Sequence, residues 1–238
     1  TSRIQLIYSG ATILPGARGE EYAHGWTREH LYAQSLGGFH ASVNDAPATD
    51  LHALRASSGA CNSVRSNRLF GVVATRPTSR PDCELNCVSG VCEPADREKG
   101  RIARALLYMA IRYAGVNDTR DTPGNATWPQ LRIDAVATSA ALLVEWSERF
   151  PPDAFEIARN NVIAQPVHQG NANPFISTPA LARCLFAPGS AAQSPQHRAP
   201  LPPPTWPMLT SPSPSLLPGA PPPLSLPPPS PPPPLPLP

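Results

Sequence analysis

"GWTREHLYAQS", residues 25–35, places a glutamate directly before a histidine, with an arginine in front of the pair. Glu29 and His30 are residue types that a metal-assisted hydrolysis uses, because a carboxylate oxygen suits a hard cation and a neutral imidazole accepts a proton near working pH. An adjacent Glu-His pair is nevertheless more often exposed, or satisfied inside a core. Only the surrounding sequence can indicate whether Glu29 and His30 have a catalytic role or a structural one.

A second stretch, "DLHALRASSGACNSVRSN" at residues 50–67, adds the parts that the first one lacks. The strand-like run Asp50–Arg55 precedes a polar segment that contains Asn62. A strand with the histidine, a second strand and a helix offering an oxygen ligand would form a small ββα cradle for one metal ion. The structural alternatives are that Asn62 caps a helix and that His52 packs on its apolar neighbours or binds backbone.

Proline divides the 238-residue chain into two parts, since 22 of its 34 prolines lie between Pro188 and Pro238. Proline has no N–H for helix or sheet hydrogen bonds, so residues 188–238 predict a disordered or polyproline II tail. Residues 1–187 are enough for one domain with a substantial core.

The net charge of +2 neither requires nor excludes a polyanionic partner. The basic residues are 18 arginines and one lysine. An arginine can bind a phosphate group through two parallel hydrogen bonds. No apolar run approaches the roughly 18 residues of a spanning helix, so no membrane span is expected. The first residues lack the pattern of a signal peptide, which is expected to be absent or already removed.

Five cysteines favour disulfides over a zinc site, because their spacings do not match paired C-x-x-C knuckles. The pairing stays open, and the odd count leaves one thiol unpaired or intermolecular. Two glycosylation sequons begin at Asn117 and Asn125. Together these features favour the secretory route.

The periodicity of the chain predicts an α+β fold, with an irregular β-containing N-terminal half followed by packed helices. Apolar residues recur at helical spacing over 102–113 and again over 131–146. Asp153 and Glu156 resemble a capping box that opens a helix to about Gln165. Thr178-Pro179 predicts the start of a last short helix.

Eight short strings follow one another in an order that resembles the endonuclease I family of periplasmic and extracellular nucleases. They are "WTREH", "DLHALR", "NSVRSN" with "FG", "EP", "KGRIARALLYM", "RY", "FEIARN" and "QGNANPF", within residues 8–186. The resemblance implies a His-Me finger (ββα-metal) core packed with several helices.

The resemblance also implies roles for individual residues. His30 falls on the general base, and Glu29 and Asn62 fall on the protein ligands of a single Mg²⁺. Family members cleave DNA, and often RNA, with little sequence preference, and leave 5′-phosphates. Weaker candidates for phosphate contact lie in or beside these motifs: Arg28, Arg55 and Arg65.

The sequence departs from the family pattern at several points. Ala172 and Ser177 stand where the family usually has an arginine and an aspartate, and Ala53 stands where it often has an asparagine. Residues 31–49 contain no arginine that could act on the leaving side. Since the base and both ligands are intact, we expect reduced or shifted activity rather than a dead site.

The leading hypothesis is therefore a secreted, monomeric, Mg²⁺-dependent nuclease. The alternative is an extracellular matrix or wall protein whose degenerate nuclease fold serves as a binding module, since the Ser/Pro runs of the tail resemble those of wall proteins. No HExxH motif supports a metalloprotease.

Overall fold

A computed structural model describes residues 3–19, 25–40, 46–74, 82–114 and 130–187. Three sequence predictions lie outside these residues: the Pro-rich tail with its boundary at 187/188, and the sequons at Asn117 and Asn125. The described residues form mixed helices and small sheets, which confirms the predicted α+β class. None of the helices within them is long and apolar enough to cross a membrane.

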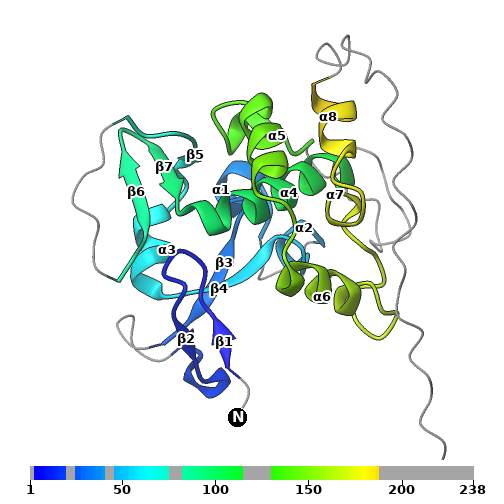
Figure 1. Ribbon diagram of the computed structural model, residues 1–238. Helices are drawn as coiled ribbons and strands as arrows, with labels where there is room; N and C mark the ends of the chain where they lie inside the picture. Colours follow the sequence, from blue (N-terminus) through cyan, green and yellow to red (C-terminus); the bar gives the residue numbers. More distant parts are fainter. Residues whose placement is uncertain (1–2, 20–24, 41–45, 75–81, 115–129, 188–238) are drawn as a thin grey trace, which may run out of the picture. The chain divides into compact units, whose positions relative to one another are not determined.

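The centre of the fold is a strand–strand–helix unit (Figure 1). Strand β3 (Thr27–His30) pairs antiparallel with β4 (Leu54–Ser57), so that Glu29 lies opposite Arg55. Helix α3 (Gly59–Arg65) follows at once, and its N-cap Ser58 accepts a hydrogen bond from the Cys61 amide. The predicted order is confirmed, but residues 51–53 form a turn and the second strand begins only at Leu54. The Asp50 carbonyl accepts from the amides of Ala53 and Leu54, which closes this turn.

The N-terminal segment packs against this unit. A short hairpin of β1 (Ile4–Gln5) and β2 (Thr12–Ile13) is followed by the 3-10 helix η1 (Pro15–Ala17). The Ile7 amide donates to the Ala56 carbonyl, which places the next residue, Tyr8, beneath β3. Two short helices follow β3 in the chain, α1 (Gln34–Gly37) and α2 (Ala46–Thr49).

A three-stranded sheet stands beside α3, with the order β5 (Leu69–Phe70), β7 (Val91–Pro94) and β6 (Leu85–Val88). Two disulfides fasten it: Cys61–Cys83 joins α3 to the segment before β6, and Cys87–Cys92 links β6 to β7. Cys184 is a free, exposed thiol. The expected disulfide chemistry is confirmed, and the structure supplies the pairing that the spacing left open.

The C-terminal half is helical around α4 (Asp96–Arg112), which packs against α5 (Ala140–Arg149). The remaining helices are η3 (Ile133–Ala135), α6 (Ala154–Ile163), α7 (Pro174–Ser177) and α8 (Leu181–Phe186). The capping box is confirmed, because the Asp153 side chain accepts from the Glu156 amide. The predicted helical periodicity over 131–146 is only half right. The Phe70 carbonyl pairs with the Thr138 amide, and Ser139 caps a helix that starts at Ala140.

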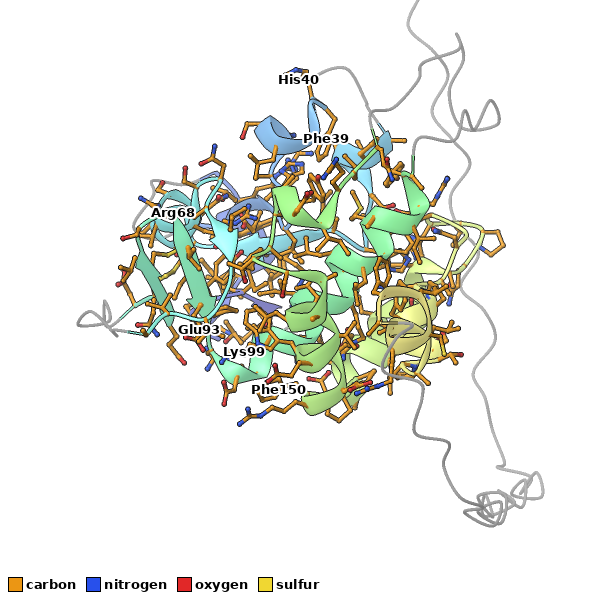
Figure 2. The ribbon with its side chains drawn as sticks, turned by 90° about the horizontal axis from the view of Figure 1, so that it is seen from above. Phe39, His40, Arg68, Glu93, Lys99 and Phe150 are labelled. Carbon is orange, nitrogen blue, oxygen red and sulfur yellow. A yellow bond between two sulfur atoms is a disulfide. The ribbon has the colours of Figure 1, made fainter. Side chains whose placement is uncertain are left out.

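Helix α4 combines apolar packing with buried charge. A Cβ added at Gly100 would lie 2.0 Å from the Phe150 carbonyl, so only glycine allows the end of α5 to approach this closely. Lys99 donates to Glu93 at 2.6 Å, near Phe150 (Figure 2). Arg104 makes a bidentate pair with Glu156 of α6. These paired charges fix the helices against β7 and against one another.

Candidate active site

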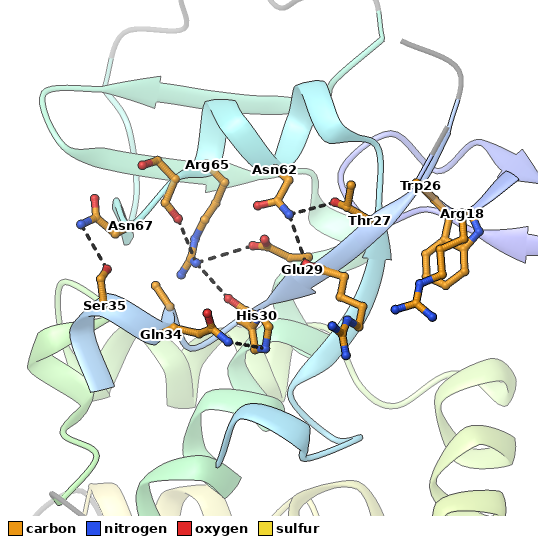
Figure 3. A pocket seen from close by; sticks show the side chains of 14 residues that line it. Arg18, Trp26, Thr27, Glu29, His30, Gln34, Ser35, Asn62, Arg65 and Asn67 are labelled. Carbon is orange, nitrogen blue, oxygen red and sulfur yellow. Dashed lines mark hydrogen bonds and ion pairs between the residues drawn. The ribbon is translucent and has the colours of Figure 1, made fainter. Parts of the chain in front are cut away.

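A cleft of about 680 Å³ opens where β3, α1 and α3 meet (Figure 3). Glu29, His30 and Asn62 all line it, so the structure brings together the three residues that the sequence singled out as base and ligands. The rest of the lining is mostly polar or cationic and includes Arg18, Trp26, Thr27, Arg28, Gln34, Ser35, Ser66 and Asn67.

Glu29 is a buried carboxylate at the floor of this cleft, with 2% of its surface exposed. Its Oε1 accepts from the Tyr8 hydroxyl at 2.7 Å and lies 3.6 Å from Arg65 Nη1. Burial raises the pKa of Glu29, and Arg65 and the Tyr8 hydrogen bond oppose this shift. No described residue donates to Oε2. That oxygen is therefore available to a cation.

His30 follows on the same strand and is partly buried. Its Nε2 lies 2.9 Å from the Ala48 carbonyl of α2 and 3.1 Å from the Gln34 side-chain amide. A carbonyl oxygen can only accept, so the contact with Ala48 requires Nε2 to carry the hydrogen of the neutral ring and leaves Nδ1 with its lone pair. The Gln34 nitrogen cannot donate to a protonated Nε2, so with this tautomer the Gln34 amide turns its oxygen towards the ring. Burial lowers the pKa of His30, and the charges of Arg28 and Arg65 lower it further, against the effect of the Ala48 hydrogen bond. The ring is thus prepared as a neutral proton acceptor.

Asn62 projects from the middle of α3, so it is not the cap that the sequence left as an alternative. Its Nδ2 donates to the Thr27 hydroxyl at 3.0 Å and to the Arg28 carbonyl at 3.2 Å. These two acceptors fix the orientation of the amide. They leave Oδ1 as the atom that can take a further partner.

The three arginines proposed for phosphate contact have different environments. Arg28 is exposed and lines the cleft. Arg65 lines it too, but only 1% of its surface is exposed, because its guanidinium donates to the carbonyls of His30 and Leu31. Arg55 lies instead at a separate small cavity with Arg101, where its buried Nη2 has no described partner. Phosphate contact therefore stays a prediction for Arg28 alone.

The "QGNANPF" segment acts at a distance from the cleft. The Gln169 side chain accepts from the Leu51 amide at 2.6 Å and donates to Asp50 Oδ1 at 3.0 Å. Asp50 also accepts from the hydroxyls of Tyr108 and Tyr113. This buried network holds the chain directly after α2, whose Ala48 carbonyl binds His30. This role could not be predicted from local sequence patterns, because the partners are 58 or more residues apart.

The nearby departures from the family pattern, Ala172 and Ser177, lie at exposed positions. Ala172 is exposed, and the Ser177 hydroxyl accepts from Asn160 Nδ2 at 3.2 Å. His52, as expected, binds backbone, with Nε2 2.9 Å from the Asn171 carbonyl. Tyr8 was missed by the sequence reasoning, since nothing in the short apolar run that it ends marks it as a partner of Glu29.

A ββα unit that presents a histidine, a carboxylate and an amide oxygen to a polar cleft has the groups that a metal-assisted hydrolase would use. Comparison with known proteins narrows the class: the Endonuclease I family model matches residues 3–180, and the chain belongs to this family. An extracellular ribonuclease of Bacillus subtilis is 37% identical over 183 residues, which cover 75% of this chain and 59% of that protein. A periplasmic deoxyribonuclease of Aeromonas hydrophila is 30% identical over 130 residues, covering 53% and 46%. The chain thus spans about half the length of these curated relatives.

Proposed function

We propose that this protein is a secreted, metal-dependent endonuclease that hydrolyses phosphodiester bonds in DNA and RNA with little sequence preference. Family membership supports the reaction class, and the relatives named extracellular or periplasmic nucleases support secretion. The observation that carries the proposal is the hydrogen bond between His30 Nε2 and the Ala48 carbonyl. It leaves Nδ1 unprotonated in the same cleft as the oxygens of Glu29 and Asn62.

His30 serves as the general base in this proposal. Its Nδ1 takes a proton from the attacking water, and the developing imidazolium is stabilised by the Ala48 carbonyl that already accepts from Nε2. The lowered pKa keeps the ring neutral before the reaction. The attacking oxygen bonds to phosphorus as the P–O3′ bond breaks. The leaving O3′ takes a proton from solvent and becomes a 3′-hydroxyl, and the phosphate stays on O5′ of the other fragment.

The residues present fit a single Mg²⁺. Glu29 offers a carboxylate oxygen and Asn62 an amide oxygen, and both are hard donors of the kind that this ion prefers. Two protein ligands leave room for waters and phosphate oxygens. When bound, the ion would neutralise charge on the phosphate and the leaving oxygen. Tyr8 and Arg65 would hold Glu29 in place for it.

We propose both DNA and RNA as substrates because the names of the relatives mention one or the other. The Bacillus protein is called a ribonuclease and the Aeromonas proteins are called deoxyribonucleases. Discrimination between the two would depend on contacts with the 2′-hydroxyl. The exposed Arg28 contributes positive charge at the cleft for either backbone.

The test is an endpoint assay on two substrates. The full chain is incubated with supercoiled plasmid and with single-stranded RNA, each with Mg²⁺ or with EDTA. We expect cleavage of both with Mg²⁺ and none with EDTA. The new ends should accept a labelled phosphate from polynucleotide kinase only after phosphatase treatment, as 5′-phosphates require. An inert protein would disprove the proposal and leave the binding-module alternative. Equal cleavage in EDTA would instead disprove the metal dependence.

A further inference from the structure

One wall of the cleft carries a cation that neither the sequence motifs nor the proposed chemistry uses. The Arg18 guanidinium lies over the Trp26 ring, 5.8 Å from its centroid. Figure 3 shows the two side chains together beside Thr27, at one end of the cleft that contains Glu29 and His30.

Backbone and side-chain hydrogen bonds hold this pair in position. The Trp26 amide donates to the Ala17 carbonyl at 3.1 Å, and the Gly19 amide donates to the Trp26 carbonyl at 3.1 Å. The indole Nε1 donates to the Pro15 carbonyl at 3.0 Å. Residues 15–19 are thereby fixed to the residue that leads directly into β3. Arg18 thus has a defined place relative to the candidate base, although it is 12 positions away in the chain.

Arg18 is also accessible from the cleft, whereas Arg65 is buried and Arg55 lines a separate cavity. It is exposed, and no ion pair joins it to a carboxylate of the described residues. A guanidinium stacked on an aromatic ring keeps its edge donors for another acceptor. Among the described residues, no hydrogen bond or ion pair of this guanidinium has to break for its donors to bind an anion.

We infer that Arg18, supported by Trp26, binds a backbone phosphate next to the scissile one. The inference rests on the proposed function, since only an extended polyanion would occupy both the centre of the cleft and its end. Trp26 is a positioning residue here: its ring orients the guanidinium, and its indole N–H is already engaged by Pro15.

The test separates binding from cleavage. In full-length protein carrying His30→Ala, the affinity for a fluorescent single-stranded oligonucleotide is measured by anisotropy over a range of salt concentrations. Arg18→Ala is compared with Arg149→Ala, which removes an exposed arginine that lies over the Phe150 ring outside the cleft. Trp26→Leu and the Arg18→Ala/Trp26→Leu double variant complete the set, and thermal midpoints check folding.

We expect Arg18→Ala to weaken binding by about 5- to 20-fold, as for one charge-assisted hydrogen-bonding group. The slope of log affinity against log salt should fall by about 0.7, the value for one lost phosphate contact to a single strand. Arg149→Ala should change neither quantity. Trp26→Leu should lose part of the same affinity, and the double variant should bind no more weakly than Arg18→Ala, because the two residues act as a unit.

Two results would overturn the inference while leaving the proposed function intact. One is an unchanged salt slope in Arg18→Ala although the parent with His30 cleaves nucleic acid. The other is a loss of affinity in Trp26→Leu that is larger than the loss in Arg18→Ala, with the two losses adding in the double variant. That result would mean that the Trp26 ring stacks on a base. A parent that neither binds nor cleaves nucleic acid would reject both the proposed function and the inference.

Discussion

At the scale of single residues, Glu29 and His30 show how neighbouring positions acquire different properties. Glu29 is buried against Tyr8, and its pKa is raised by burial. His30 keeps one nitrogen bound to backbone, and its pKa is lowered by burial. Burial favours the neutral form of each group, so desolvation moves an acid and a base in opposite directions. A cation at Glu29 would restore its charged form.

We predict that His30→Ala lowers the cleavage rate by about 10²- to 10⁴-fold, the usual cost of losing a general base. Oligonucleotide affinity should be nearly unchanged, because His30 accepts a proton rather than holding a phosphate. The matched control is His168→Ala, which removes an exposed histidine of the segment after α6. Cleavage by His30→Ala at close to the parental rate would remove this residue from the mechanism.

We predict that Asn62→Ala raises the Mg²⁺ concentration for half-maximal rate by about tenfold or more, since even outer partners of a metal site affect affinity by about 10–100-fold. Asn62→Asp should retain most of the affinity, because it keeps an oxygen ligand while losing the Nδ2 donor. Asn161→Ala, at an exposed position of α6, is the control. The single-metal proposal fails if the Mg²⁺ titrations of Asn62→Ala and the parent coincide.

At the scale of elements, α6 illustrates how a local signal is reinforced by tertiary contacts. Asp153 accepts from the Glu156 amide as N-cap and also pairs with Arg101 of α4. Partial burial raises the pKa of Asp153, but the Glu156 amide and Arg101 outweigh this and the net pKa is lowered. A carboxyl whose folded pKa is depressed stabilises the fold above its unfolded pKa and loses this contribution as pH falls through the folded one.

We predict that Asp153→Ala lowers the free energy of unfolding by about 1 kcal/mol at neutral pH, or roughly 2–4 °C in thermal midpoint. The difference from the parent should shrink as pH falls below the ordinary range of an aspartate. Asp153→Asn retains an N-cap acceptor and loses the charge, so it should fall between the two. Thermal melts at neutral and acidic pH measure this, and a deficit independent of pH would show that the charge contributes nothing.

At the scale of the whole molecule, the hydrogen bonds that Asp50 accepts from Tyr108 and Gln169 join the two halves of the described fold, whereas the two disulfides lie within the N-terminal half. The cleft depends on both halves. The N-terminal half supplies its lining, and the "QGNANPF" segment holds the chain that follows α2. The free thiol of Cys184 lies outside this framework.

The tail gives the prediction at this scale. Residues 188–238 offer few backbone donors and no periodic apolar face. Ordering this segment would therefore form too few favourable contacts to offset the loss of conformational entropy. Deleting residues 189–238 should leave the thermal midpoint and the plasmid-cleavage rate almost unchanged. A truncated chain that unfolds would place the domain boundary elsewhere. Wall-polysaccharide binding by the full chain alone would instead favour the matrix alternative.

The sequence by itself determined the features that depend on neighbours in the chain. The apolar face of α4 and the cap of α6 follow from spacing, because hydrogen bonding and periodicity act over a few residues. The Glu29–His30 pair was visible for the same reason. The order strand–strand–helix was implied by the resemblance to the endonuclease I family, since spacing alone does not establish it. The predicted helical run over 131–146 failed in its first half, where the pairing of Phe70 with Thr138 overrides the local pattern.

Only the tertiary structure decided which polar groups are free to act. The sequence does not distinguish Arg65 from Arg18. In the fold, Arg65 donates to the carbonyls of His30 and Leu31, whereas Arg18 lies exposed over the Trp26 ring. The partners of Glu29 and His30, Tyr8 and the Ala48 carbonyl, lie 21 and 18 positions away. A side chain's chemistry depends on which distant donors and acceptors the folded chain brings to it and on how deeply it is buried. The neighbouring residues in the sequence reveal neither of these.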